Sequence, residues 1–254
     1  MADSAAPVLL EERHGDVLLL TLNRPHRLNA LNAVLHHYLG AAIARAPEAG
    51  VRVIVITGSG EKSFCSGGDM TEMAGLEQDA NPLPPREERK NGTVELGTTP
   101  LPVIAAINGY CYGGGLRLAV GCDIRLAADH ATFRIPGAEY GLVVAAATLP
   151  RLVGTSRAKD WIYTARTFEA REALESGLVS GLFPGDALLP AAMEMAQTIA
   201  AHSAEAVQGA KRVIDMATLD DAAREEEEAI NRRLRGSQEQ SARFRDATRR
   251  VTGR

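Results

Sequence analysis

Two glycine-rich segments are the part of this sequence whose residue types and spacing could do chemistry. They are residues 64–69 (FCSGGD) and residues 108–115 (NGYCYGGG). Each lies where a predicted strand ends and a helix is about to begin, so its backbone N–H groups lack helical partners and face outward. Glycine also lets a ligand approach the backbone closely. Side by side, the two loops could direct two N–H groups at one oxygen and stabilise charge on a thioester carbonyl.

Simpler explanations exist for these segments and for their neighbours. The glycines of either loop alone could serve only tight turns and close packing. The spacing matches neither the GxGxxG dinucleotide fingerprint nor a phosphate loop. Cys65 and Cys111 could be nucleophiles, but no base lies nearby in the sequence, and small buried thiols are common. The six histidines show no metal-ligand spacing, so we expect no metal site.

The elements that would position the two loops are short apolar runs separated by turn residues. Strands are predicted at residues 8–13, 17–22, 51–57, 103–107 and 123–127, and helices at 32–46, near 86–96 and at 116–120. Repeats of strand, turn and helix predict parallel strands joined by crossovers, and hence an α/β fold. From residue 187 onward the pattern is almost wholly helical, punctuated at Ser203, Asp220 and Ser237. The acidic run 225–228 is predicted to be a solvated helix face.

Composition places the chain in an ordinary class. Its 254 residues are 45% hydrophobic and 24% charged, with a net charge of −4, as expected of a globular protein with a core rather than a nucleic-acid binder. Three cysteines without a CxxC pair favour a reducing cytoplasm. No run of about 20 uncharged apolar residues exists, so no membrane span is expected, and the acidic N-terminus does not resemble a signal peptide.

Five segments carry a resemblance to a known family. They are residues 23–31 (NRPHRLNAL), 58–69 (GSGEKSFCSGGD), 102–115 (PVIAAINGYCYGGG), 122–127 (CDIRLA) and 173–179 (ALESGLV). In this order they resemble the motifs of the crotonase superfamily, the enoyl-CoA hydratase/isomerase family. The resemblance implies a core of ββα units forming a spiral, residues 1–185, and a C-terminal helical segment, residues 186–254, that mediates homotrimers or hexamers. It also implies an acyl-CoA substrate and no separate cofactor, since CoA is part of the substrate.

The same resemblance assigns residues to a site. The backbone N–H groups of Ser66 and Gly114 would form the oxyanion hole. The substrate-binding residues would be Arg27, Leu28, Ala30, Ser66, Gly67, Gly68, Asp69, Met70, Gly114 and Arg117. For Asp69, a cap on the following helix is the favoured role.

The sequence departs from the family at both catalytic acids. An ordinary hydratase has one glutamate in GGGxE and another in FxxPE, which act together on one water. Here the two positions hold Arg117 and Gly137. Arginine stays protonated and glycine has no side chain, so plain hydration is not expected. Glu139 lies two residues after Gly137. If this segment is helical, its side chain is rotated by about 200° from that of residue 137 and points away from the expected site. Glu139 would be a catalytic candidate only if a local bulge turned its side chain back toward that site.

Arg117 itself has two readings. It could bind an acidic group of the substrate, or it could pair with a buried carboxylate such as Glu139. The ion pair with a buried carboxylate is the favoured reading.

Residues 143–147 (VVAAA) are apolar where the family often has glycines, which would narrow the acyl pocket. The function expected is an acyl-CoA lyase or isomerase of the enoyl-CoA hydratase type. The alternatives are a divergent isomerase, decarboxylase or thioester hydrolase, a non-catalytic acyl-CoA-binding protein, or a pure assembly subunit.

Overall fold

Two sheets form the centre of the molecule. A computed structural model describes residues 6–76, 79 and 81–253. The large sheet has the order β1-β2-β3-β5-β7-β10 and the small sheet the order β4-β6-β8-β9. Their bounds are β1 Leu9–His14, β2 Val17–Leu22, β3 Val53–Gly58, β4 Ser63–Cys65, β5 Val103–Ile107, β6 Tyr110–Tyr112, β7 Ile124–Ala128, β8 Thr132–Arg134, β9 Thr167–Glu169 and β10 Gly181–Phe183.

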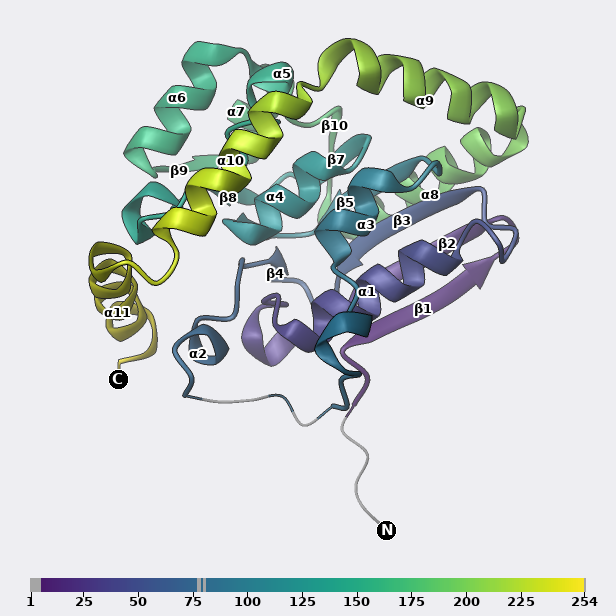
Figure 1. Ribbon diagram of the computed structural model, residues 1–254. Helices are drawn as coiled ribbons and strands as arrows, with labels where there is room; N and C mark the ends of the chain where they lie inside the picture. Colours follow the sequence, from purple (N-terminus) through teal and green to yellow (C-terminus); the bar gives the residue numbers. More distant parts are fainter. Residues whose placement is uncertain (1–5, 77–78, 80, 254) are drawn as a thin grey trace.

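The chain alternates between the sheets in a way that confirms the predicted spiral. Each of β3, β5 and β7 belongs to the large sheet and is followed directly by a strand of the small sheet, β4, β6 or β8. β1 and β2 form the predicted antiparallel hairpin, and β2, β3, β5, β7 and β10 pair in parallel. Figure 1 shows the resulting layers, with helices packed around both sheets.

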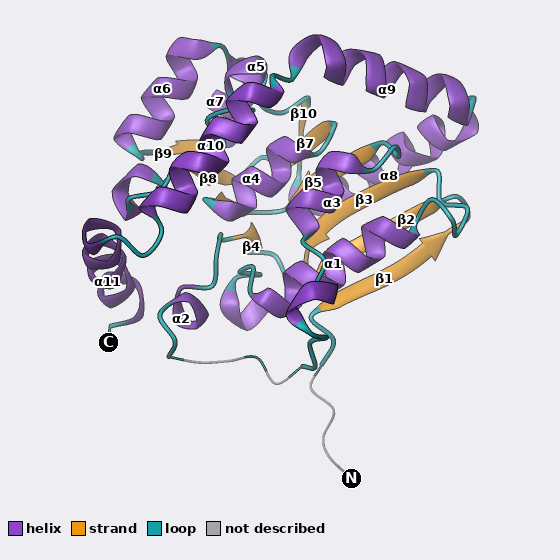
Figure 2. Cartoon of the chain, in the orientation of Figure 1, coloured by secondary structure: helices purple, strands orange, loops and turns teal. Residues whose placement is uncertain are grey.

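Helices make up most of the remaining chain (Figure 2). Their bounds are α1 Ala33–Arg45, α2 Met70–Met73, α3 Gly92–Thr98, α4 Gly114–Gly121, α5 Pro150–Val153, α6 Thr155–Thr164, α7 Ala170–Glu175, α8 Gly185–Ala201, α9 Ala204–Thr218, α10 Asp221–Leu234 and α11 Gln238–Thr252. Short 3₁₀ turns are η1 Pro25–Arg27, η2 Arg86–Glu88 and η3 Ala138–Tyr140. Ser203, Asp220 and Ser237 each cap the next helix through the side chain, as predicted.

The core explains why the strands form where they do. β3 and β5 are buried along their whole length, as expected of parallel strands covered on both faces. α8 packs against the large sheet and contributes Leu188, Ala192 and Ala196 to the same hydrophobic core. The predicted boundary at residue 185 therefore falls at the start of a helix that belongs to this core.

One predicted helix is shorter than expected. The segment near 86–96 begins with the turn η2, and the regular helix α3 starts only at Gly92. The Asn91 side chain accepts hydrogen bonds from the amides of Thr93 and Val94, which fixes the helix start at that point.

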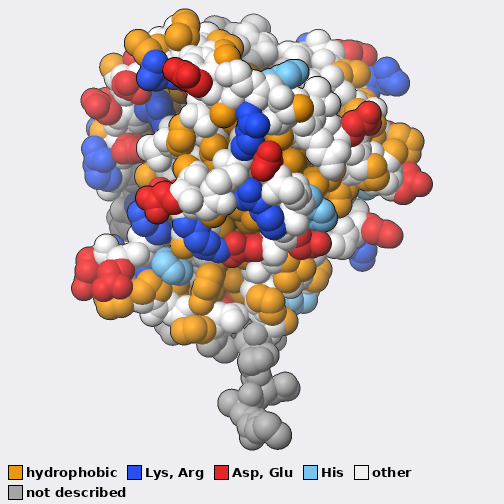
Figure 3. Space-filling model, turned by 90° about the vertical axis from the view of Figure 1, so that its right-hand side faces the viewer, with side chains coloured by type: hydrophobic (Ala, Val, Ile, Leu, Met, Phe, Trp, Pro, Cys, Tyr) orange, Lys and Arg blue, Asp and Glu red, His pale blue; other side chains and the backbone are white. Residues whose placement is uncertain are grey.

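The surface and the helices bear on two further expectations. No helix in the described ranges is both long and apolar enough to cross a bilayer. On the face shown in Figure 3, side chains of both charge signs are interspersed with hydrophobic ones, so no field of a single sign covers that face. The absence of a nucleic-acid partner stays a prediction.

Candidate active site

The two glycine-rich loops meet, as the sequence predicts. Gly67 has a φ of 110°, a conformation that favours glycine. A Cβ added to Gly67 would lie 3.3 Å from the amide nitrogen of Gly114, and one added to Gly114 would lie 3.3 Å from the amide nitrogen of Gly68. A Cβ on Gly115 would collide with the carbonyl of Cys65. These contacts require small residues on both sides and bring the backbones of the two loops together.

Two amides of these loops are free to bind a ligand. Within the described residues, the N–H groups of Gly68 and Gly114 donate to no protein group. Gly114 is the first residue of α4, where a helix leaves its amides unpaired. Gly68 forms a bridge with Leu31 through the flanking Gly67 carbonyl and Asp69 amide, which leaves the amide of Gly68 itself unused.

The prediction that Ser66 supplies an oxyanion-hole amide is wrong. The amide of Ser66 donates to the carbonyl of Leu28 at 3.0 Å, so it is already occupied. The positive φ of Gly67 turns the chain between residues 66 and 68, and the free donor on this loop is that of Gly68. Ser66 instead joins its loop to the segment that contains Arg27 and Leu28.

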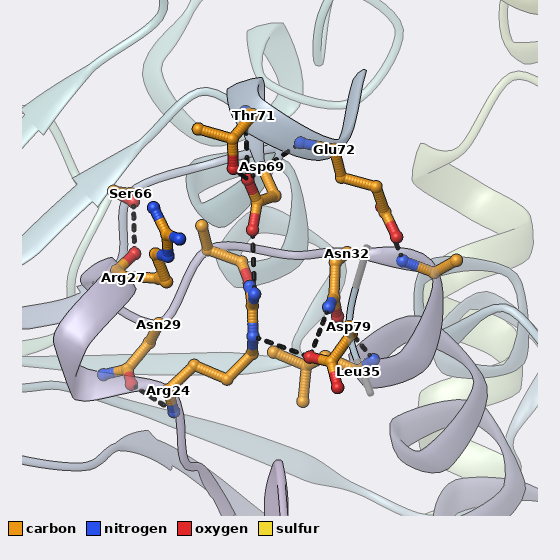
Figure 4. A network of polar contacts seen from close by, with 12 residues as sticks. Arg24, Arg27, Asn29, Asn32, Leu35, Ser66, Asp69, Thr71, Glu72 and Asp79 are labelled. Atoms are coloured by element: carbon orange, nitrogen blue, oxygen red, sulfur yellow. Dashed lines mark hydrogen bonds and ion pairs between the residues drawn. The ribbon is translucent and has the colours of Figure 1, made fainter. Parts of the chain in front are cut away.

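A buried ionic network holds this loop in place (Figure 4). The Arg24 guanidinium lies 2.8 Å from Asp69 and 3.5 Å from Asp79, and Asn32 donates to Asp79 at 2.8 Å. Burial alone would raise the pKa of Asp69, but hydrogen bonds from Thr71 and Arg24 outweigh it and lower the pKa. Asp69 also accepts hydrogen bonds from the first amides of α2, which confirms its capping role.

The predicted substrate-binding segment runs beside the first glycine loop. Leu28 and Asn29 have φ values of 51° and 54°, and the Asn29 side chain donates to the carbonyls of Ser59 and Ser63. Ala30 is buried, and its carbonyl accepts from Arg24 at 2.6 Å. Arg27 ends η1, and Met70 is half-buried at the start of α2. The predicted residues of this group therefore surround the loop, and their contacts with a ligand stay a prediction.

Neither position of the usual carboxylate pair holds an acid, and one has no room for any side chain. A Cβ on Gly137 would lie 2.7 Å from Cγ2 of Val144 and 2.9 Å from the carbonyl oxygen of Leu142. Such distances require the neighbouring chain to shift. The apolar loop at residues 143–147 thus fills the space beside the second position.

The expected pairing of Arg117 with Glu139 is wrong. Glu139 lies 2.6 Å from Arg134 and 3.1 Å from Arg250, and so ties η3 to α11. Both ion pairs engage the Glu139 carboxylate with side chains other than Arg117. The structure thus gives Glu139 a structural contact in place of the catalytic one considered for it.

Sequence reasoning missed two polar side chains on α10. Glu227 accepts hydrogen bonds from the amides of Ala145 and Ala147, and Asn231 exchanges two hydrogen bonds with Val143. Glu227 is 8% exposed, so the prediction of a solvated face fails at this one residue of the acidic run. Its burial depends on docking against a loop about 80 residues away in the chain, which local patterning does not reveal.

His36 lies near the start of α1. The Nδ1 atom of His36 is buried without a hydrogen-bond partner. Burial, reinforced by the charges of Arg117 and Arg235, lowers the pKa of His36 to about 4. The imidazole is therefore neutral at neutral pH.

The cysteines beside the loops are not nucleophiles. Cys65 and Cys111 are paired neighbours on β4 and β6 and are fully buried. Burial raises the pKa of the Cys65 thiol to about 12 and that of Cys111 well above its ordinary value. Both thiols stay protonated at neutral pH, so they cannot attack a thioester.

Two surface hollows, one lined by residues 153–157 and Asp160 and one between β1 and α1, lie away from the free amides.

Comparisons with known proteins agree with the fold. The sequence model described as Enoyl-CoA hydratase/isomerase matches residues 12–251. The chain is 38% identical over 219 residues to the putative enoyl-CoA hydratase/isomerase YngF of Bacillus subtilis, covering 85% of this chain and 83% of that protein. It is 40% identical over 211 residues to a probable enoyl-CoA hydratase of Rhizobium meliloti, covering 82% and 80%. The crystal structure of an enoyl-CoA hydratase/isomerase from Pseudoalteromonas atlantica has a TM-score of 0.83 at 28% identity, covering 94% and 97%. The chain therefore belongs to the enoyl-CoA hydratase/isomerase family of the crotonase superfamily.

Proposed function

We propose that this chain binds an acyl-CoA thioester and polarises its carbonyl oxygen between the backbone N–H groups of Gly68 and Gly114. The observation that carries this proposal is the pair of unused amides on two loops in contact. Two such donors stabilise the negative charge of an enolate or of a tetrahedral adduct. The N-terminal end of α4 adds a favourable dipole at the same place.

The proposed reaction is an oxyanion-stabilised conversion of an acyl-CoA other than ordinary hydration. Hydration in this family uses two carboxylates, and the two positions hold Arg117 and Gly137. Isomerisation, decarboxylation and thioester cleavage pass through the same oxyanion and take their acid or base from elsewhere.

Turnover assays on the purified chain test this proposal. Crotonyl-CoA should be hydrated at least about 100-fold more slowly than by a family member with both glutamates, since each acid–base group contributes about 10²–10⁴-fold. At least one other thioester of a panel should be converted. Hydration at an ordinary family rate would refute the loss of the carboxylate pair, and failure to bind any acyl-CoA would refute the site.

A second candidate is an acyl-CoA-binding protein without catalysis. The observation that favours it is that none of the groups considered as a catalyst is available. The two family glutamates are absent, Glu139 is held in an ion pair with Arg134, and the Cys65 thiol is protonated. Calorimetric binding of acyl-CoA with no turnover across the thioester panel would select this candidate.

We also propose that copies of the chain associate through the C-terminal helices. Val213, Ile214 and Met216 on α9 are 61%, 59% and 78% exposed, and no residue of α9 is buried. Burying apolar side chains against another copy would remove them from water.

A further inference from the structure

Two helices begin beside the free amides, and each carries a nitrogen-bearing side chain one turn further on. α4 begins at Gly114, and Arg117 lies three residues later. α1 begins at Ala33, two residues after Leu31, which bridges to Gly68, and His36 follows in its first turn. Helical side chains lean toward the helix N-terminus, so both lean toward the end of their helix that begins beside the free amides.

Arg117 is a half-buried cation that pairs with none of the described carboxylates. No carboxylate among the described residues lies within ion-pair distance of its guanidinium. The acids around the site are engaged elsewhere: Asp69 by Arg24, Glu139 by Arg134 and Arg250, and Glu227 by the amides of Ala145 and Ala147. The anion that would satisfy Arg117 is therefore not supplied by these acids.

The surroundings of Arg117 suit an anion. The neutral His36 ring has a buried nitrogen without a partner and can offer one N–H group. Arg235, at the C-terminal end of α10, adds a second positive charge that acts on the same imidazole. A guanidinium binds a carboxylate through two parallel hydrogen bonds, and partial burial strengthens such a contact.

We propose that Arg117 binds a second carboxylate on the acyl group, so that the preferred ligand is the CoA thioester of a dicarboxylic acid. The inference rests on the proposed carbonyl site and names its substrate class. Arg117 stands where an ordinary hydratase has its first glutamate, and the inference gives it a role in substrate recognition. A phosphate group of CoA has similar chemistry, and the experiment separates the two sources.

Calorimetry on the purified full chain uses matched ligand pairs. Succinyl-, glutaryl- and adipyl-CoA are each compared with the straight-chain acyl-CoA of equal carbon number, butyryl-, valeryl- and hexanoyl-CoA. At least one dicarboxylic ester should bind about tenfold or more tightly than its partner, as expected of a charge-assisted contact in a partly buried site. Free CoA is titrated as a third ligand.

Variants assign the preference to one side chain. In Arg117→Met the ratio between the paired ligands should fall to about one, while the affinity for free CoA and for the uncharged acyl esters is kept. Arg117→Lys should retain part of the preference, because lysine keeps the charge but not the fork. Arg233→Met, an exposed residue of α10, serves as the matched control and should change nothing.

The possible outcomes distinguish failure of the inference about Arg117 from failure of the proposed acyl-CoA site. Equal affinities for all three pairs in the unmodified chain would overturn the inference and leave the proposed function intact, even if Arg117→Met failed to fold. A preference that survives in Arg117→Met, or a loss of free CoA binding in that variant, would also overturn it. Failure of every CoA ester to bind would overturn the proposed function together with the inference.

Discussion

At the scale of single residues, glycines decide both what the site offers and what it lacks. Gly114 presents a free amide because it begins α4, and Gly68 does so because the chain turns at Gly67. Gly137 is different, since Val144 and the Leu142 carbonyl occupy the space that its side chain would need. Close packing therefore leaves no room for a side chain at residue 137, where the family resemblance expects a carboxylate, so a single substitution would not place one there.

The packing at Gly137 gives a first prediction. Gly137→Ala should lower the free energy of unfolding by about 1–3 kcal/mol, because the added Cβ overpacks against Val144. Chemical denaturation measures the change. Gly209→Ala in α9 is the control: its Cβ would meet nothing within 4 Å, and it should be neutral or stabilising by up to about 1 kcal/mol. Equal effects of the two substitutions would contradict the packing argument.

At the scale of elements, α10 holds the loop at residues 143–147 in place. Glu227 and Asn231 lie one turn apart and fix residues 143–147 through four hydrogen bonds. Ala145 has a φ of 59° in this loop, an unusual conformation for a residue with a side chain. The shape of the loop therefore depends on a helix distant in sequence.

Removing one of these acceptors gives a second prediction. Glu227→Gln places an NH₂ group against one buried amide, which should destabilise the chain by about 1–3 kcal/mol. The amides of Ala145 and Ala147 should also exchange with deuterium faster. Glu228→Gln, at an exposed position of the same helix, should leave both readouts unchanged. Indistinguishable behaviour of the two variants would show that Glu227 does not hold the loop.

A third prediction concerns acid and the contact between α6 and α7. Hydrogen bonds from Arg166 to Glu172, opposed by burial and supported by Trp161 and Arg157, lower the pKa of Glu172 from 4.5 to about 2. The depressed pKa contributes stability above pH 4.5 that is lost as the pH falls toward 2. Glu172→Gln should therefore lose less melting temperature between pH 5 and about pH 3 than the unmodified chain.

The matched control for the acid prediction lies on the same helix. Glu175→Gln, at an exposed position of α7, should show the full acid-induced loss in melting temperature. An acid profile of Glu172→Gln identical to that of Glu175→Gln would contradict the role of the ion pair with Arg166.

Some elements of the fold could be predicted from the sequence, and others could not. Long β-branched runs such as β3 and β5 were predictable because their hydrophobic pattern spans several residues. The strands of the small sheet have three residues each, too few to display a period of two. The free amide at residue 68 depends on the φ of Gly67, and the burial of Glu227 depends on tertiary docking, so neither was visible in the sequence.

At the scale of the whole molecule, the C-terminal helices differ in how much they contact the rest of the chain. α8 completes the core, and α10 and α11 contact the loops around the site. α9 has no buried residue and exposes an apolar group at Val213, Ile214 and Met216. This division suggests that α9 is the helix left for contact with other copies.

A fourth prediction follows for assembly. Size-exclusion chromatography with light scattering should give three or six times the 27.1 kDa of one chain. Ile214→Asp should shift the distribution toward single chains, because it places a charge in the proposed apolar interface. A mass of one chain for the unmodified protein at micromolar concentration would contradict the proposed association.

The most direct test of the account measures the thioester carbonyl itself. Infrared difference spectroscopy of bound butyryl-CoA, labelled with ¹³C at the carbonyl, reports how strongly two N–H groups polarise that bond. The account predicts a carbonyl stretch at lower frequency in the complex than in water, because both donors withdraw charge onto the oxygen. A frequency equal to or above that in water would show that the amides of Gly68 and Gly114 do not converge on the ligand.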